Sequence, residues 1–174
     1  MSESGLALLP PGVRLRRAHA ADQPAIRSLI SANHLNPLSL HWQDFVVAVK
    51  TSGQVLGIGQ VKQHSDGSRE LASIAVVKAR RRQGIARAII LELMSRNPPP
   101  LYLTCRSALG PFYSQFGFSA LGIEQMPPYF RRIYRLARVL MRAASGETQM
   151  LVMGILSSRS VRPQIKKSGR DRSF

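Results

Sequence analysis

The sequence feature that most constrains the fold is a change of hydrophobic period just before Gly84. Residues 70–77 are almost all apolar or small, which is typical of a buried strand. The basic stretch 78–83 follows, and from 84 to 95 apolar residues recur at helical spacing. A strand that passes through a short turn directly into a helix predicts a layered α/β domain.

The remaining segments continue this alternation of strands and helices. Expected strands are residues 13–18, 45–49, 55–62, 70–77, 101–104, 118–123 and 150–156. Expected helices are one capped by Asp22, then 84–95, 109–116 and 128–144. The order β-α-β-β-β-α-β-α-β-α-β predicts a mixed α/β sheet around one core. We expect an N-terminal extension over 1–12, a single domain over 13–156 and a basic, disordered tail over 157–174.

The charge of the chain is strongly positive, with 25 Lys and Arg against 9 Asp and Glu in 174 residues. A basic surface attracts nucleic acid, anionic lipid or a polyanionic cofactor, and charge alone does not choose among them. No apolar run approaches the roughly 18 residues of a membrane span, and no basic segment precedes Leu6–Leu9 as in a secretory signal. Cys105 is the single cysteine, so no internal disulfide and no metal site are expected. We therefore expect a cytoplasmic protein.

The turn before the second long helix has the composition of a phosphate-binding site. It reads Arg81-Arg82-Gln83-Gly84-Ile85-Ala86. Backbone N–H groups at a helix start have no acceptor within the helix and lie at the positive end of its dipole. The small residues Gly84 and Ala86 would let a diphosphate approach these groups. No Gly-Lys-Ser/Thr follows, so a Walker loop is excluded. The alternative is a solvated run of arginines followed by a helix-start glycine.

This turn resembles the acetyl-CoA signature R/Q-x-x-G-x-G/A of the GNAT superfamily of N-acetyltransferases. Similar stretches are residues 16–26, 53–57 and 112–118, so that the resemblance covers about residues 13–123. It implies a mostly antiparallel central sheet with helices on both faces, and acetyl-CoA as co-substrate without a metal. The residues implied to contact the cofactor are Val76, Val77, Arg81, Arg82, Gln83, Gly84, Ile85, Ala86 and Arg87.

The resemblance also implies direct attack of an amine on the thioester, without an acyl-enzyme. Tyr113 occupies the position where many relatives place a general acid, which would protonate the leaving thiolate. The backbone N–H of Val76 or Val77 is expected to polarise the thioester carbonyl, and the spacing does not choose between them. The alternative for Tyr113 is an aromatic residue that only packs in its short helix.

Glu70 is the candidate general base. It is the only carboxylate on the strand that leads to the cofactor turn, and relatives often carry an acid there. Some relatives carry a glutamate on the following strand instead, where this chain has Thr104. The alternative for Glu70 is a surface residue at a strand edge, paired with Arg69 or Lys62.

Four further residues lie near the expected site. We expect Cys105 to be a buried structural thiol, since no histidine is near it in sequence. His34 and His41 flank a loop that borders the acceptor site in the resembling family, and Trp42 could line it or pack in the core.

The helix expected at 128–144 places its arginines on one stripe and its apolar residues on the opposite face. The stripe comprises Arg131, Arg135, Arg138 and Arg142. This face could be solvated, or it could contact an acidic protein or peptide, RNA or the ribosome, or an anionic membrane. Whether the chain forms a homodimer is left open.

The sequence thus predicts an N-acetyltransferase that moves an acetyl group from acetyl-CoA to a primary amine of a small molecule or protein. Two alternatives are a nucleic-acid- or ribosome-associated basic protein on the same scaffold, and a CoA-binding sensor without turnover. The sequence does not identify the acceptor.

Overall fold

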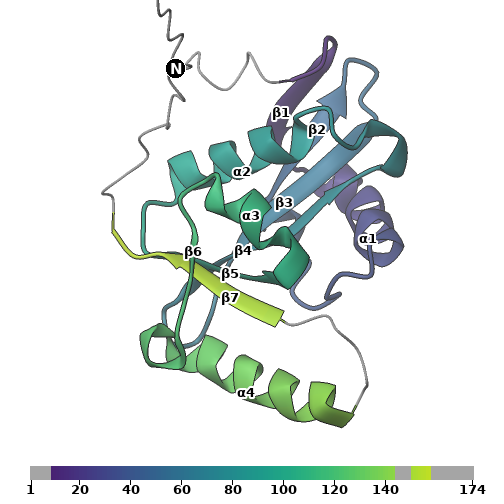
Figure 1. Cartoon of the computed structure of the whole chain (residues 1–174). Helices are drawn as coiled ribbons and strands as arrows, with labels where there is room; N and C mark the ends of the chain where they lie inside the picture. Colours follow the sequence, from purple (N-terminus) through teal and green to yellow (C-terminus); the bar gives the residue numbers. More distant parts are fainter. Residues whose placement is uncertain (1–8, 144–149, 158–174) are drawn as a thin grey trace, which may run out of the picture.

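In the computed structural model, the described residues are 9–143 and 150–157, and they form a seven-stranded sheet with helices on both faces (Figure 1). The strands are β1 Val13–Arg17, β2 Phe45–Lys50, β3 Val55–Gln63, β4 Arg69–Val76, β5 Leu101–Arg106, β6 Ser119–Ala120 and β7 Met150–Ile155. The helices are α1 Gln23–Ala32, α2 Ile85–Arg96, α3 Gly110–Ser114 and α4 Pro128–Ala143. The strand order is β1-β2-β3-β4-β5-β7-β6, and of these neighbours β4 and β5 are parallel and the rest antiparallel. The predicted fold class is confirmed.

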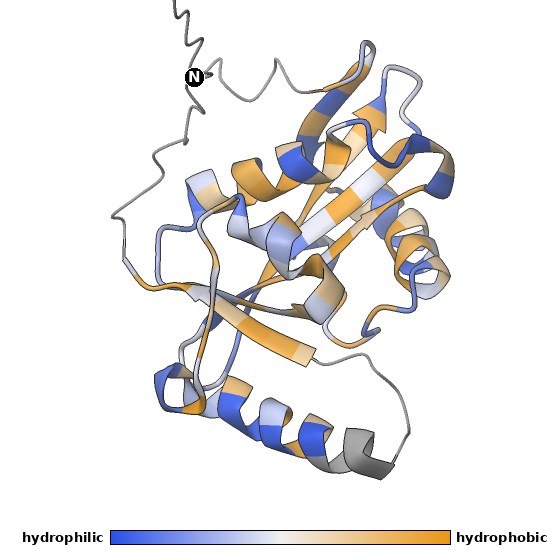
Figure 2. Cartoon of the chain, viewed as in Figure 1, coloured by the Kyte–Doolittle hydropathy of each residue, from blue (hydrophilic) through white to orange (hydrophobic). Residues whose placement is uncertain are grey.

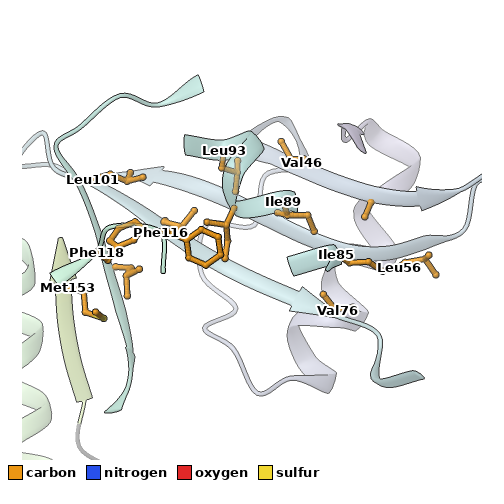
Figure 3. Packing of buried hydrophobic residues seen from close by; sticks show 14 of the residues in the cluster. Val46, Leu56, Val76, Ile85, Ile89, Leu93, Leu101, Phe116, Phe118 and Met153 are labelled. Carbon is orange, nitrogen blue, oxygen red and sulfur yellow. The ribbon is translucent and has the colours of Figure 1, made fainter. Parts of the chain in front are cut away.

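Alternating residues of each strand fill a different core on each face of the sheet. We call the side covered by α2 and α3 the α2 face, and its core includes Ile85, Leu103 and Phe116 (Figure 3). We call the opposite side the α1 face. There, one cluster packs under α1, and a smaller cluster packs Phe130 of α4 against Tyr102 of β5. Since Leu103 and Tyr102 are adjacent on β5, they face opposite ways and divide the two cores.

Two glycines of β3 allow α2 to lie directly on the sheet. A Cβ atom on Gly59 would come within 2.6 Å of Ile89 Cγ2, and one on Gly57 would come within 2.9 Å of Ile85 Cγ2. Real Cβ atoms do not approach other atoms this closely, so any larger residue would displace the helix. The sheet therefore fixes the start of α2, where the predicted phosphate-binding turn lies.

Strands β4 and β5 separate soon after they pair. Within the described strands their pairing is confined to Glu70 opposite Tyr102. The β3–β4 register shifts between Ile58 and Gln60, and on β4 Ser73 has the left-handed φ of 58°. A bulge of this kind bends a strand away from its neighbour. The second half of β4 thus runs beside an opening in the sheet, which we call the β4–β5 slot.

Several predicted boundaries differ from the structure. Asp22 lies at the start of α1, but its side chain does not cap that helix. Its carboxylate instead accepts hydrogen bonds of 2.6 and 2.9 Å from the Arg16 guanidinium and one of 2.8 Å from the His19 amide. The Arg16 hydrogen bond lowers the pKa of Asp22, although burial alone would raise it. The Asp22 carboxylate thus binds Arg16 of β1 instead of the backbone amides of α1.

The sixth strand is also shorter than predicted, since β6 covers two residues rather than 118–123. The chain leaves the sheet at Leu121, where a short helical turn at Ile123–Gln125 leads into α4. The expected tail over 157–174, apart from Ser157, and most of the N-terminal extension lie outside the described residues. Among the helices that the structure describes, none is long and apolar enough to cross a membrane.

Candidate active site

The turn between β4 and α2 has the backbone geometry of an anion site. Arg82 and Gly84 both adopt left-handed φ values, of 61° and 80°. The first helical hydrogen bond runs from the Ala88 amide to the Gly84 carbonyl at 2.9 Å. The amides of Ile85, Ala86 and Arg87 therefore precede the helical ladder and are free to bind an anion. These features fit the diphosphate of coenzyme A.

Two arginine side chains of this turn contact neighbouring parts of the protein instead of pointing into solvent. Arg81 donates a hydrogen bond of 2.8 Å to Asn33 Oδ1 at the end of α1, and a longer one of 3.4 Å to the Val76 carbonyl. Arg87 lies over the Phe116 ring, 5.5 Å from its centroid. Arg82 is exposed. Arg81 thus ties the turn to α1, and the arginine run is more than a solvated stretch of charge.

The two candidate amides for the thioester differ in their partners. The Val77 N–H donates to the Leu56 carbonyl at 2.8 Å, so it is occupied within the sheet. Gly57 lies opposite Val76. Because hydrogen-bonded and non-bonded pairs alternate in an antiparallel ladder, the N–H and C=O of Val76 point away from β3. The contact from Arg81 to the Val76 carbonyl agrees with this direction. Ile74 follows the bulge at Ser73, where the β3–β4 register shifts, so its N–H is a further candidate donor toward the β4–β5 slot.

Glu70 is buried, with 8% of its surface exposed. Its Oε1 accepts a hydrogen bond of 2.9 Å from the Thr104 hydroxyl of β5, and its Oε2 lies 3.0 Å from Nε2 of His64. Lys62 lies opposite Glu70 on β3, and its ammonium donates to the Leu38 carbonyl at 2.8 Å. The alternative of a surface glutamate at a strand edge is wrong, because β4 is an interior strand and its neighbours enclose this carboxyl group.

His64 was not singled out from the sequence, where it resembles an ordinary residue of a polar turn. In the structure its ring stacks on Tyr129 of α4, with centroids 3.4 Å apart and planes 15° from parallel. Asp66, in the same turn, accepts a hydrogen bond of 2.7 Å from the Tyr129 amide. No local signal in the sequence links residue 64 to residue 129, because the contact depends on where α4 docks.

Gln60 extends the polar groups of the α1 face from Glu70 toward the bulge. It is fully buried on β3, and its Nε2 donates to the Ser73 hydroxyl at 2.7 Å. Its Oε1 is a buried acceptor that no described residue satisfies. Such atoms usually bind water or a ligand. Since Gln60 lies opposite Ala72, this acceptor lies between Glu70 and Ile74 along the strands.

Tyr113 belongs to the opposite face. It packs with the α2-face core, edge-on to Phe112 and Phe118. Burial, with a smaller effect of the nearby Cys105 thiol, raises the pKa of Tyr113 to about 12. Thr104 and Cys105 are adjacent on β5 and point to opposite faces. Glu70, which Thr104 contacts, and Tyr113, which lies near Cys105, are therefore on opposite sides of the sheet at the β4–β5 slot.

Cys105 is half-buried, and its Sγ lies 3.8 Å from the Met153 sulfur. Burial raises the pKa of the Cys105 thiol. A raised pKa disfavours the thiolate that a nucleophile needs. These surroundings agree with the expected structural thiol.

The loop after α1 and that helix line an open pocket of about 630 Å³. Its lining includes Arg27, His34 and His41. Trp42 does not line it and packs instead against the core under α1. The loop is attached at one end to the cofactor turn through Asn33 and in its middle to Lys62 beside Glu70.

Figure 2 shows hydrophilic and hydrophobic residues interleaved along α4. Its arginine stripe is only partly a solvated face. Arg135 and Arg138 are exposed, but Arg131 is half-buried and donates to the Met126 carbonyl at 3.1 Å. Leu136 is 61% exposed beside the two exposed arginines. Arg142 falls in the last turn of α4, outside the residues whose side chains are described.

Comparisons with known proteins agree with this geometry. Residues 41–120 match the family model described as acetyltransferase (GNAT) domain. No curated protein matches the sequence. Among solved structures, the chain is similar to N-acetylglutamate synthase from Neisseria gonorrhoeae, complexed with coenzyme A and N-acetyl-glutamate. The TM-score is 0.63 and the identity 20%, over 82% of this chain and 35% of that one. The chain thus spans about a third of the length of that relative.

Two shorter proteins are similar over nearly their whole length. Rv2747 from Mycobacterium tuberculosis, in complex with CoA, has a TM-score of 0.60 and 20% identity over 82% of this chain and 99% of that one. The ribosomal-protein-S18-alanine N-acetyltransferase from Escherichia coli has a TM-score of 0.57 and 18% identity over 93% and 99%. At these identities the similarity shows a shared fold.

The fold, the helix-start turn and the family match define the acyltransferase class. Residues 41–120 match the acetyltransferase (GNAT) domain family, and the chain shares the fold of the GNAT structures named above. The resemblance and the fold class predicted from the sequence are therefore confirmed.

Proposed function

We propose that this protein is an N-acetyltransferase that moves an acetyl group from acetyl-CoA directly to a primary amine. The observation that carries the proposal is the anion-binding turn at Gly84, which lies at the end of β4 beside an open slot in the sheet. A buried carboxyl group reaches this slot from one face and a tyrosine from the other. When bound, acetyl-CoA supplies the activated acetyl group as a thioester.

The cofactor turn would hold the diphosphate through backbone amides. The amides of Ile85, Ala86 and Arg87 lie at the positive end of α2, and Gly84 leaves room for close approach. Gln83, Arg81 and Arg82 complete the turn, and Arg81 keeps it attached to α1. The arginines add long-range attraction for an anion.

The polarising amide is Val76 or Ile74 rather than Val77. The Val77 N–H is already bonded to Leu56. Ile74 was not among the residues predicted from the sequence. It lies four residues from Glu70, on the order of 13 Å at the usual strand rise, whereas Val76 lies roughly 20 Å away. The shorter separation favours Ile74 as the donor to the thioester carbonyl.

Glu70 would accept the proton of the attacking ammonium. Because Glu70 lies about 13 Å along the strand from Ile74, one or more bound waters would relay the proton from the reacting amine to its carboxyl group. The unsatisfied Oε1 of Gln60 lies on this path and would hold such a water. On the α1 face, the loop that carries His34 and His41 would border the acceptor.

Tyr113 would act on the leaving thiolate from the α2 face. A tyrosine with a pKa of about 12 stays protonated at neutral pH. An ordinary thiol has a pKa of about 8.5, so complete proton transfer from Tyr113 to a thiolate is uphill. Tyr113 would therefore stabilise the thiolate first by donating a hydrogen bond.

The deciding experiment has two steps. Calorimetry with acetyl-CoA should show saturable binding that is lost in Gly84→Glu, because the new carboxylate would repel the diphosphate. Thiol release with a panel of primary amines should then show turnover. Binding without turnover would favour a CoA sensor.

The exposed Arg135 and Arg138 support one further candidate, an anionic partner such as an acidic protein, RNA or a membrane surface. Salt-dependent RNA binding without acetyl-CoA binding would favour a nucleic-acid-associated protein over the enzyme. The oligomeric state is accessible to light scattering in the same preparations.

A further inference from the structure

The carboxyl group of Glu70 is held at both oxygens by side chains from two other parts of the sheet. Thr104 of β5 donates to Oε1 at 2.9 Å, and Nε2 of His64, in the turn after β3, lies 3.0 Å from Oε2. Each carboxylate oxygen has two lone pairs, so each can still accept a proton or a water. The two contacts therefore restrict the orientation of the group without blocking it.

His64 is itself held by the first turn of α4. Its ring lies between the stacked Tyr129, at a centroid distance of 3.4 Å, and the edge-on Phe130, at 5.6 Å. Its side chain is only 10% exposed. A ring packed on two sides has little freedom to turn, so its Nε2 stays directed at Glu70.

The first turn of α4 is fixed in turn by Asp66. Asp66 Oδ2 accepts the Tyr129 amide at 2.7 Å, and its Oδ1 accepts the amide and hydroxyl of Ser68. Burial opposes ionisation of Asp66, but the Ser68 hydroxyl and the amides of Tyr129 and Ser68 lower its pKa overall. An ionised Asp66 is a strong cap for a helix N-terminus. The turn after β3 thus binds α4 through Asp66 and Glu70 through His64.

From these contacts we infer that His64 is a positioning residue for Glu70, and that the first turn of α4 sets its orientation. His64 donates its Nε2–H to Glu70 Oε2. When a proton leaves the acceptor ammonium, an N–H bond breaks and the proton passes to bound water, which gives up a proton in turn so that an O–H bond forms on a free lone pair of Glu70, while the His64 proton stays on Nε2. Other charged or titratable groups near this pair include Lys62, Asp66, Tyr102 and Tyr129. The inference rests on the proposed role of Glu70 as base.

The first test reads the imidazole directly and needs no acceptor. Long-range proton–nitrogen NMR of the 15N-labelled protein identifies which ring nitrogen is protonated, and His64→Gln assigns the signal among four histidines. We expect His64 Nε2 to carry a proton. Tyr129→Ala should shift the His64 ring signals, because the stacked ring is lost, whereas Tyr129→Phe should preserve them. An unprotonated Nε2 would overturn the inference.

The second test measures turnover by thiol release with the amine panel. His64→Ala should lower kcat about tenfold to a hundredfold, because the Glu70 carboxyl group would no longer be held in position for proton transfer. The affinity for acetyl-CoA should not change, because the turn at Gly84 is intact. His64→Gln offers an amide N–H to Glu70 and should restore much of the loss. His19→Ala, with a side chain 58% exposed beyond β1, is the matched histidine control.

The outcomes distinguish the role of Glu70 as base from the role of His64 in positioning it. If Glu70→Gln lowers kcat and His64→Ala does not, Glu70 is the base and His64 does not position it. If Glu70→Gln retains full kcat, the proposed base itself is wrong. Thermal unfolding checks that each variant is folded. Should His64→Ala fail to fold, His64→Gln against Tyr129→Ala gives the same comparison, because the second variant removes only the support of the ring.

Discussion

The Thr104 hydroxyl of β5 donates a 2.9 Å hydrogen bond to the buried carboxyl group of Glu70 on β4. Some relatives carry a glutamate at the position of Thr104, so the sequence left the base open between the two strands. In this protein the residue on β5 does not supply a carboxylate but supports the one on β4. A single carboxyl group is then available at the closed end of the β4–β5 slot.

Replacing Glu70 tests its role as base. Glu70→Gln keeps the size of the side chain and can still accept from Thr104, but it cannot take up a proton. We expect kcat to fall by about 10²- to 10⁴-fold with acetyl-CoA affinity unchanged. Thr104→Val removes one hydrogen bond to Glu70, so it should lower kcat by less than about tenfold. Equal losses in both variants would point to a structural effect.

Replacing Tyr113 tests the stabilisation of the leaving thiolate. Tyr113→Phe keeps the aromatic packing and removes the hydroxyl, so kcat should fall at least about tenfold while acetyl-CoA binding persists. Because the pKa of Tyr113 is raised to about 12, it keeps its proton across the usual assay range. Any alkaline loss of activity below that pH should therefore be the same in Tyr113→Phe. Unchanged turnover would leave Tyr113 as a packing residue.

A pair of glycine variants separates backbone strain from cofactor binding. Gly84 and Gly53 have left-handed φ values of 80° and 88°, and Gly53 lies in the open β2–β3 turn with no atom near its Cβ position. Alanine at either position should destabilise the fold by about 1 kcal/mol. Only Gly84→Ala should also weaken acetyl-CoA binding. Calorimetry and thermal unfolding of both variants would check this, and equal affinities would count against the turn as the diphosphate site.

The contact between β3 and α2 predicts a packing effect on stability. Gly59→Ala would place a methyl group 2.6 Å from Ile89 Cγ2 and 2.7 Å from Ile74 Cδ1. The free energy of unfolding should fall by about 1–3 kcal/mol in urea titrations. Gly122→Ala is the control, since its Cβ would lie 3.7 Å from the nearest atom and its φ of −69° suits any residue. If Gly59→Ala leaves the free energy of unfolding unchanged, α2 can shift away from β3 without destabilising the fold.

The ion pair of Asp22 and Arg16 predicts a pH-dependent contribution to stability. The Arg16 hydrogen bond lowers the pKa of Asp22 from 3.8 against the opposing effect of burial. A lowered pKa in the folded state means that the stabilisation is complete above pH 3.8 and is lost as the pH falls through the folded value. Asp22→Asn should therefore cost about 2 kcal/mol at neutral pH. Urea titrations at several pH values should show this difference shrinking in acid.

The fold was predictable because its signals are local. The apolar runs of β2 and β3, the change of period at Gly84 and the apolar face of α4 are each visible within one stretch of sequence. The cofactor turn was also predictable, since a strand end, a positive-φ glycine and a helix start are adjacent in the chain. Glu70 was proposed as the only carboxylate on the strand that leads to this turn, and Tyr113 from the family resemblance.

The rest of the site depends on tertiary contacts. His64 acquires its role only because α4 docks on the turn after β3 and brings Tyr129 against it. Ile74 becomes a candidate donor only because of the bulge at Ser73, which has no local signal in the sequence. Arg131 has the same spacing as the exposed Arg135, yet it bonds to the Met126 carbonyl at the base of the helix. Spacing gives the face of a helix but not which of its residues meet a neighbour.

The sheet is joined at its centre by one pair of residues, Glu70 and Tyr102. A join this narrow imposes almost no register from one half of the sheet on the other. Side-chain contacts across this junction, such as the Thr104 hydrogen bond to Glu70 and the shared core under α2, must therefore hold the two halves of the sheet in alignment.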